Sequence, residues 1–142
     1  PSDPQGGFTR MIGWERPMSD GLESLPAIVD IYLDRGITRI DILEPSLTGR
    51  GQVNSFSKAV SAGVSSLGVP RVVIDCALLH DLSSRVLGVH LEMRKQLAAR
   101  NGQLRLAAVT EPVRDVLAVT RIDQLIPVDP SVDYAIEQFD SP

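Results

Sequence analysis

The stretch that decides the fold is RVVIDCALLHDLSSRVLG, residues 71–88. It opens with an apolar, β-branched run that ends at Asp75, and such a run is typical of a strand buried on both faces of a sheet. Ser83 and Ser84 then stand directly before apolar residues spaced three and four apart, which predicts a helix with one buried face. We therefore expect a buried strand, a short polar turn and a helix that begins at the two serines.

The start of this predicted helix is a candidate functional position. A helix N-terminus presents unpaired N–H groups and the positive end of the helix dipole, so it favours a side-chain oxygen, an anion or a phosphate. Ser83 or Ser84 is either no more than the N-cap of the helix or a group that a partner binds or modifies. Both interpretations stay open on these residues alone.

The chain divides into an N-terminal tail or linker, residues 1–26, and one domain, residues 27–142. The first segment contains four prolines and four glycines and shows no sustained hydrophobic period. The apolar residues of this segment, which either form a short strand against the domain or belong to a disordered tail, are Phe8, Met11, Ile12 and Trp14.

Order begins at Ala27 with a predicted β-hairpin. Ile28–Leu33 and Ile37–Leu43 are its strands, and Asp34-Arg35-Gly36 places a glycine where a tight turn requires a positive φ. A helix over residues 26–35 is the competing interpretation, because some apolar residues there are also spaced by three and four. The density of Ile and Val favours the hairpin.

The rest of the chain alternates helix and strand. Turn formers in residues 44–51 precede a helix that ends at Gly68, with Asn54 or Ser55 as its cap. The later elements are expected as the strand of residues 71–75, a helix up to Arg100 that Asn101-Gly102 ends, a strand within residues 102–110, a helix opened by Glu111-Pro112, a strand at residues 125–128 and a helix capped by Ser131. The sequence thus predicts an α/β fold with a mixed, mostly parallel sheet, an N-terminal antiparallel hairpin and about four helices.

Composition argues against several classes of function. A net charge of −4, no basic cluster and only three Phe, two Tyr and one Trp make a nucleic acid an unlikely partner. The single Cys76 permits no internal disulfide, and beside a buried strand we expect it to act as a small hydrophobic residue. No apolar run has the length of a membrane span and the first residues do not resemble a signal peptide, so we expect a cytoplasmic protein. No cofactor or metal is expected, because GxGxxG, P-loop, HExxH and CxxC patterns are missing.

From residue 27 onward the chain resembles a STAS domain, the fold of bacterial anti-anti-sigma factors. The first match joins the strand Val72-Val73-Ile74-Asp75 to Leu87-Gly88-Val89, which look like the strand and the helix start of the family. The second is NGQLRLAAVTEPVRDVLAVTRIDQLIPVDPSVDYAI, residues 101–136, which is similar to the C-terminal half of the family. The third is IVDIYLDRGITRIDILEPSLTG, residues 28–49, which looks like its opening hairpin.

This resemblance implies a function and a site. In family members that switch, a serine directly after the Asp of an Asp-Ser-Ser-Gly turn is phosphorylated by a partner anti-sigma factor that is itself a serine-protein kinase. The ungapped register places Ser84 at that position, with Ser83 as second choice, although Ser83, Arg85 and Val86 replace the Asp, the second Ser or Thr, and the Gly of the turn. The resemblance therefore implies a non-enzymatic anti-sigma factor antagonist, a monomer or weak homodimer, that regulates transcription by releasing a sigma factor. Its expected partner-binding residues are Asp75, Asp81, Ser83, Ser84, Arg85 and Val86.

Two other functions remain open. A non-phosphorylated STAS scaffold or sensor module of a larger regulatory complex is favoured by the loss of Asp and Gly from the turn. A small serine hydrolase would need Ser84, His90 and Asp75 in hydrogen-bond reach of one another. His90 lies six residues after Ser84 on the same predicted helix and should point elsewhere, and we expect His80 and His90 at or near the surface.

Overall fold

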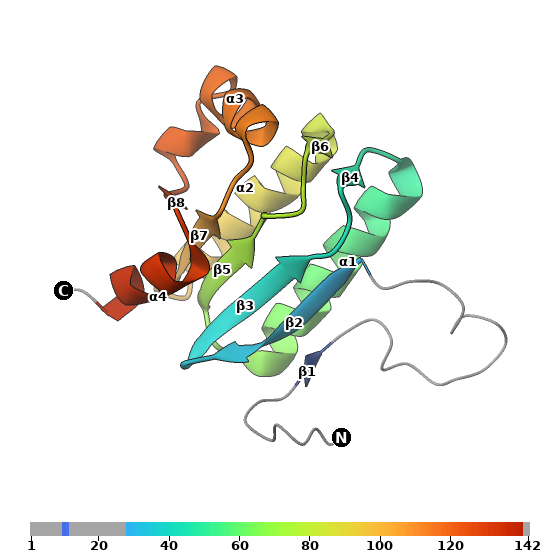
Figure 1. Ribbon diagram of the computed structural model, residues 1–142. Coiled ribbons are helices and arrows are strands. Elements are labelled where there is room, and N and C mark those ends of the chain that lie inside the picture. The colour runs from blue at the N-terminus through green and yellow to red at the C-terminus, as the bar shows by residue number, and fades with distance from the viewer. Residues whose placement is uncertain (1–9, 12–27, 141–142) are drawn as a thin grey trace, which may run out of the picture.

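The computed structural model describes residues 10–11 and 28–140 (Figure 1). Its main sheet has six strands in the order β1-β2-β3-β5-β7-β8, and β4 and β6 form a separate parallel pair. The strands of the main sheet are β1 (Arg10–Met11), β2 (Val29–Asp34), β3 (Ile37–Ile42), β5 (Arg71–Asp75), β7 (Gln103–Ala107) and β8 (Val128–Asp129). The remaining elements are β4 (Ser46–Leu47), β6 (Asp81–Leu82), α1 (Arg50–Leu67), α2 (Ser84–Ala98), α3 (Glu111–Val119), the 3₁₀ turn η3 (Ile122–Gln124) and α4 (Val132–Asp140).

The antiparallel part of the sheet consists of β1, β2 and β3, and β2 and β3 form a hairpin. Its register pairs Asp34 with Ile37, and the two residues between them, Arg35 and Gly36, have φ values of 52° and 80°. Positive φ at both positions twists the connection in the same sense as the strands, which is why two residues are enough to reverse the chain. The predicted hairpin is confirmed, and the competing helix over residues 26–35 is wrong from Val29 onward.

The parallel part confirms the predicted alternation of strand and helix, in which β3, β5, β7 and β8 are parallel neighbours. Two boundaries differ. Helix α1 begins at Arg50, before Asn54 and Ser55, because Gln52 Oε1 accepts the N–H groups of Thr48 and Gly49 at 3.3 and 3.1 Å and so satisfies the helix start. The expected caps Asn54 and Ser55 are therefore wrong.

The last strand lies later than the expected residues 125–128. The chain first forms η3, and the Ile126 N–H donates to the Ile122 carbonyl at 2.9 Å. This turn directs Ile126 into the core, where it is fully buried, so pairing with β7 begins only at Val128. The apolar residues at 125–128 therefore belong to a buried turn and to the start of a strand of two residues.

Helices cover the two faces of the sheet unequally. The larger core joins α1, α2 and α3 to one face of the sheet, whereas the smaller core places only α4 on the other. In Figure 1, α4 lies in front of β5 and β7, and α1 and α2 lie behind the sheet. Val72 and Ile74 of β5 belong to the larger core and Val73 to the smaller one, so this strand is apolar without alternation.

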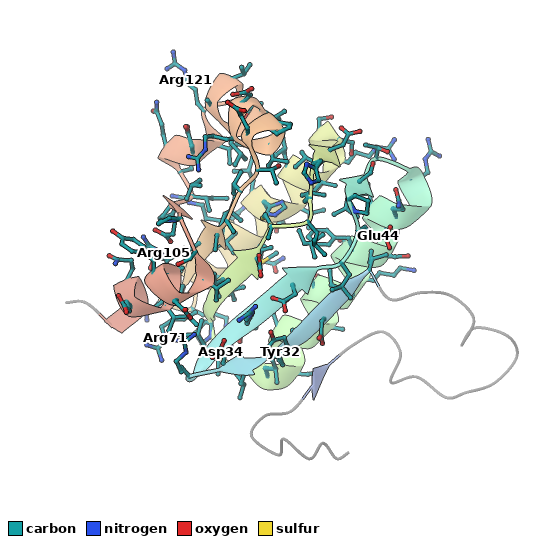
Figure 2. All side chains as sticks on the ribbon, in the orientation of Figure 1. Tyr32, Asp34, Glu44, Arg71, Arg105 and Arg121 are labelled. Atoms are coloured by element: carbon teal, nitrogen blue, oxygen red, sulfur yellow. The ribbon has the colours of Figure 1, made fainter. Side chains whose placement is uncertain are left out.

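Charged side chains occupy the part of the α4 face that lies over β2 and β3. The Arg39 guanidinium contacts Asp34, Asp41 and Asp75 at 3.0, 2.7 and 3.3 Å and lies 5.5 Å from the centre of the Tyr32 ring. Figure 2 shows Tyr32 and Asp34 along β2. Burial raises the pKa of Tyr32, as does its hydrogen bond to Asp41 at 2.7 Å. The network joins β2, β3 and β5, and it fixes the end of β5 that leads to α2.

Candidate functional site

The N-terminus of α2 presents Ser84 to solvent. Ser84 is the first residue of the helix and is exposed, and Ser83 occupies the N-cap position with φ −93° and ψ 166°. The first turn of α2 carries no acidic residue, and Arg85 beside Ser84 is exposed. The positive end of the helix dipole is therefore not neutralised by a carboxylate of its own first turn, which favours an anionic group at this position.

Ser83 is placed very differently from Ser84. Within residues 28–140, its Oγ is buried and has no hydrogen-bond partner, and it makes no side-chain cap to α2. Ser83 therefore holds the predicted N-cap position but does not cap the helix through a side-chain hydrogen bond. Of the two serines, therefore, only Ser84 presents its hydroxyl side to solvent.

Main-chain hydrogen bonds hold this turn against the segment that precedes α1. The N–H groups of His80 and Asp81 both donate to the Pro45 carbonyl, at 2.8 and 3.2 Å, and the Ser83 N–H donates to the Leu47 carbonyl at 3.1 Å. The pairing of β4 with β6 continues the parallel order of β3 and β5. The starts of α1 and α2 are thus fixed side by side beyond the carboxyl end of the sheet, where α/β proteins commonly bind ligands and partners.

Asp75 supports the turn from below. Its Oδ2 accepts a hydrogen bond from Arg39 at 3.3 Å, and its Oδ1 accepts the Ala77 N–H at 3.0 Å. Both carboxylate oxygens are therefore used inside the protein, and Asp75 positions the segment between β5 and β6 rather than standing free beside Ser84.

The remaining predicted site residues are divided between surface and core. Asp81 and Arg85 are exposed, so a partner can reach them together with Ser84. Val86 is fully buried in the larger core, so its side chain contributes to the seating of α2 and not to the accessible surface.

The sequence reasoning missed one accessible residue of this region, Leu78, which is 54% exposed in the turn between β5 and β6. Its neighbour Leu79 is fully buried, and the Thr110 hydroxyl donates to the Leu79 carbonyl at 2.7 Å. The sequence does contain a sign of this exposed residue, namely two adjacent leucines within a polar turn. Only one of them can enter the core when the turn is held in place.

Cys76 belongs to the larger core, and His90 is buried beside Phe56 of that core. Burial raises the pKa of the Cys76 thiol to about 12, and this thiol is unsuited to nucleophilic chemistry. The expectation of a small hydrophobic cysteine agrees with its burial, whereas the expectation that His90 lies near the surface is wrong: only 4% of it is exposed. The His90 Nδ1–H donates to the Val86 carbonyl at 2.7 Å, and the ring lies 5.7 Å from that of Phe56.

This arrangement does not form a hydrolase triad. His90 is hydrogen-bonded to Val86, and Asp75 to Arg39 and Ala77. A triad requires the carboxylate to orient the histidine and the histidine to reach the serine. In the structure Ser84 is exposed at the start of α2 while His90 points into the core, so the three residues do not act as one catalytic unit.

The buried histidine predicts a dependence of stability on pH. Burial lowers the pKa of His90 below the ordinary histidine value of about 6.5, so the unfolded chain binds a proton more readily than the folded one. The free energy of unfolding should therefore be unaffected by His90 protonation above about pH 6.5. It should decrease as the pH falls from there toward the pKa of His90 in the folded state. Urea unfolding between pH 7.5 and 5 should show this decrease in the wild-type protein and a smaller one in His90→Leu. If the free energy of unfolding fell equally with pH in both proteins, His90 would not be the cause of the decrease.

Among residues 10–11 and 28–140, no helix combines the length and the apolar character needed to cross a membrane. Within the same residues, His, Cys, Asp and Glu side chains do not gather in groups of three or more that could hold a metal ion.

Solved structures with the same fold include anti-sigma factor antagonists and a sulfate transporter family protein. An anti-sigma factor antagonist from Mycobacterium paratuberculosis has a TM-score of 0.70 and 18% identity, over 80% of this chain and 93% of the other. The unphosphorylated form of the anti-sigma factor antagonist SpoIIAA has a TM-score of 0.58 and 18% identity, over 78% and 94%. A sulfate transporter family protein from Wolinella succinogenes has a TM-score of 0.61 and 14% identity, over 77% and 92%.

The family model of the STAS domain matches residues 48–135, from the segment before α1 to the middle of α4. The match covers more than half of the chain and includes β5, α2 and the turn that carries Ser84. Together with the sheet order and the four helices described above, it shows that the chain belongs to the STAS domain family.

Proposed function

We propose that this chain is an anti-sigma factor antagonist that binds an anti-sigma factor through the surface around Ser84 and thereby releases a sigma factor. The observation that carries the proposal is the exposed Ser84 at the first residue of α2, beside a serine whose Oγ is buried. The solved structures of anti-sigma factor antagonists with this fold support the same class of function. Sigma factors act in the cytoplasm, so the proposal places the chain there.

The proposed switch is phosphorylation of Ser84 by the partner. The anti-sigma factor, acting as a serine kinase, transfers the γ-phosphoryl group of ATP to Ser84 Oγ, the hydroxyl proton passes to a base of the kinase, and ADP leaves. The chain itself is the substrate and a binding protein, not an enzyme. Phosphoserine adds about −1.5 to −2 charges at neutral pH, which the N-terminus of α2 stabilises without refolding.

Phosphorylation should weaken the complex. A partner surface that fits a neutral hydroxyl meets a bulky anion after transfer, and the exposed carboxylate of Asp81 adds a further negative charge near α2. We expect the dissociation constant to rise by about two orders of magnitude, because like charges brought together at an interface cost several kcal/mol.

The test is intact-mass measurement after incubation with ATP and a purified anti-sigma kinase from the same organism. Wild-type protein and Ser83→Ala should gain the mass of one phosphate, and Ser84→Ala should gain none. Isothermal titration calorimetry should then show weaker binding of the phosphorylated protein. A phosphate that remains on Ser84→Ala and disappears in Ser83→Ala would contradict the assignment.

A constitutive STAS scaffold or sensor module is the second candidate. The turn has Ser83, Arg85 and Val86 where switching members have Asp, Ser or Thr, and Gly, and the same fold occurs in a sulfate transporter family protein. A complex that forms with no phosphate on any variant would support this candidate over the switch.

A further inference from the structure

The carboxyl end of the sheet carries exposed apolar residues on two neighbouring segments. Leu43 follows β3 and is 41% exposed, and Leu78 follows β5 and is 54% exposed. The segments run in parallel, since Asp41 pairs with Asp75 at one end and Ser46 with Asp81 at the other. Figure 2 labels Glu44, the residue after Leu43, beyond the end of β3 and beside α1. Leu43 and Leu78 therefore lie at the same end of the molecule as Ser84.

The exposure of Leu78 is imposed by the residues on either side of it. Cys76 and Leu79 are both buried in the larger core. The Ala77 N–H is held by Asp75 at 3.0 Å, the Leu79 N–H donates to the Cys76 carbonyl at 3.0 Å, and Thr110 holds the Leu79 carbonyl at 2.7 Å. Leu78 is thus presented on a fixed backbone, and a partner that buries it has little loop ordering to overcome.

Leu78 and Ser84 are close enough for one protein interface to cover both. Ser84 is six positions after Leu78 in the sequence, which limits their Cα distance to about 20 Å even for an extended chain. A protein interface of standard size covers about 800 Å² on each partner, which corresponds to a patch about 30 Å across. A kinase that places its active site over Ser84 therefore has Leu78 within reach of the same contact surface.

We propose that Leu78, with Leu43 on the neighbouring segment, is the apolar anchor by which the kinase partner of Ser84 docks. This inference rests on the proposed function and specifies the chemistry of the partner, which presents an apolar pocket to Leu78 and its active site to Ser84. The exposed polar residues Asp81 and Arg85 lie between and beside these two points and form part of the rim. An apolar centre with a charged rim is the usual composition of a specific protein interface.

The test measures binding and phosphorylation separately, with purified anti-sigma kinases of the same organism. The variants are Leu78→Ala, Leu78→Asp and the matched control Leu125→Asp, whose leucine is 48% exposed just after η3. We expect Leu78→Ala to raise the dissociation constant about tenfold and Leu78→Asp about a hundredfold, because an apolar contact is lost and then a carboxylate enters an apolar pocket. Leu125→Asp should stay within about twofold of wild type, as a surface change outside the interface does.

The kinetics distinguish an anchor from a damaged acceptor. Leu78→Asp should raise the KM for phosphorylation while kcat at saturation stays near that of wild type, since Ser84 is unchanged. Urea unfolding of each variant should match wild type, because the side chain is exposed.

The outcomes separate the anchor from the switch. Unchanged binding and KM in Leu78→Asp, with Ser84 phosphorylated, would overturn the anchor and leave the proposed function intact. Binding that depends on Leu78 without any transfer to Ser84 would support the anchor and overturn the switch. If no anti-sigma kinase binds the wild-type protein, both are overturned.

Discussion

Asp129→Ala is expected to lower the free energy of unfolding by about 3–5 kcal/mol, because it leaves a largely buried guanidinium without its partner. Arg105 Nε and Nη2 donate to the two carboxylate oxygens of Asp129 at 2.6 and 3.1 Å. Only 14% of the Arg105 side chain and 5% of the Asp129 side chain are exposed. Arg105, labelled in Figure 2, also lies 5.9 Å from the centre of the Phe139 ring on α4, so the pair joins β7, β8 and α4.

The matched control is Asp133→Ala. Arg35 and Asp133 form an ion pair of the same length, 2.6 Å, but their side chains are 50% and 77% exposed. Water already screens this pair, so we expect its loss to cost at most about 0.5 kcal/mol. Urea unfolding followed by circular dichroism measures both variants. If Asp129→Ala and Asp133→Ala lowered the free energy of unfolding equally, burial would not determine how much the Arg105–Asp129 pair stabilises the protein. The double change Arg105→Met with Asp129→Leu should recover much of the stability, because it removes both charges.

Gly102→Ala is the second change with a large expected effect, a loss of about 3 kcal/mol. A Cβ at this position would lie 2.1 Å from the Pro70 carbonyl oxygen and 2.6 Å from Pro70 Cβ. The same carbonyl accepts the Gln103 N–H at 3.1 Å, where β7 begins beside β5. Backbone atoms cannot move aside as a flexible side chain can, so the methyl group would push apart two central strands at their start.

Gly88→Ala provides the opposite result in the same assay. Gly88 lies inside α2, is exposed, and has no atom within 4 Å of the position that a Cβ would take. Alanine there should stabilise the protein by about 0.5–1 kcal/mol, because glycine loses more backbone entropy in a helix. A destabilised Gly88→Ala together with an unaffected Gly102→Ala would contradict the packing described for both positions.

Local patterns predicted most of the fold. The hairpin follows from Arg35-Gly36, the end of α1 from Gly68 with φ 70°, and the end of α2 from Asn101 with φ 61°. Each of these residues determines the backbone within a few positions of itself, so its effect can be seen in a short stretch of sequence. The cap of α1 was misplaced because Gln52 performs the task through a side chain that no single-residue preference identifies.

The site was less predictable, because it depends on contacts between distant segments. The apolar helix pattern predicts both Ser83 and Ser84, and only the resemblance to the STAS family prefers Ser84. The contrast between the two side chains arises only when the turn is bound to Pro45 and Leu47. We expect His90 at or near the surface from the sequence alone, yet α1 brings Phe56 against it in the folded chain. Leu78 and Leu79 are identical in kind, and only the hydrogen bonds of the folded turn decide which of them reaches solvent.

The hydrogen bonds of the β4–β6 pair and of the Ser83 N–H come from the main chain alone. These bonds do not depend on the identity of the side chains that they hold in place, so the start of α2 can keep its course when exposed residues such as Arg85 are exchanged. Gene duplication can therefore give one cell several domains with the same frame and different contact residues. Each copy can then acquire its own regulator, and cross-talk between parallel signalling routes is reduced by changes confined to a few exposed positions.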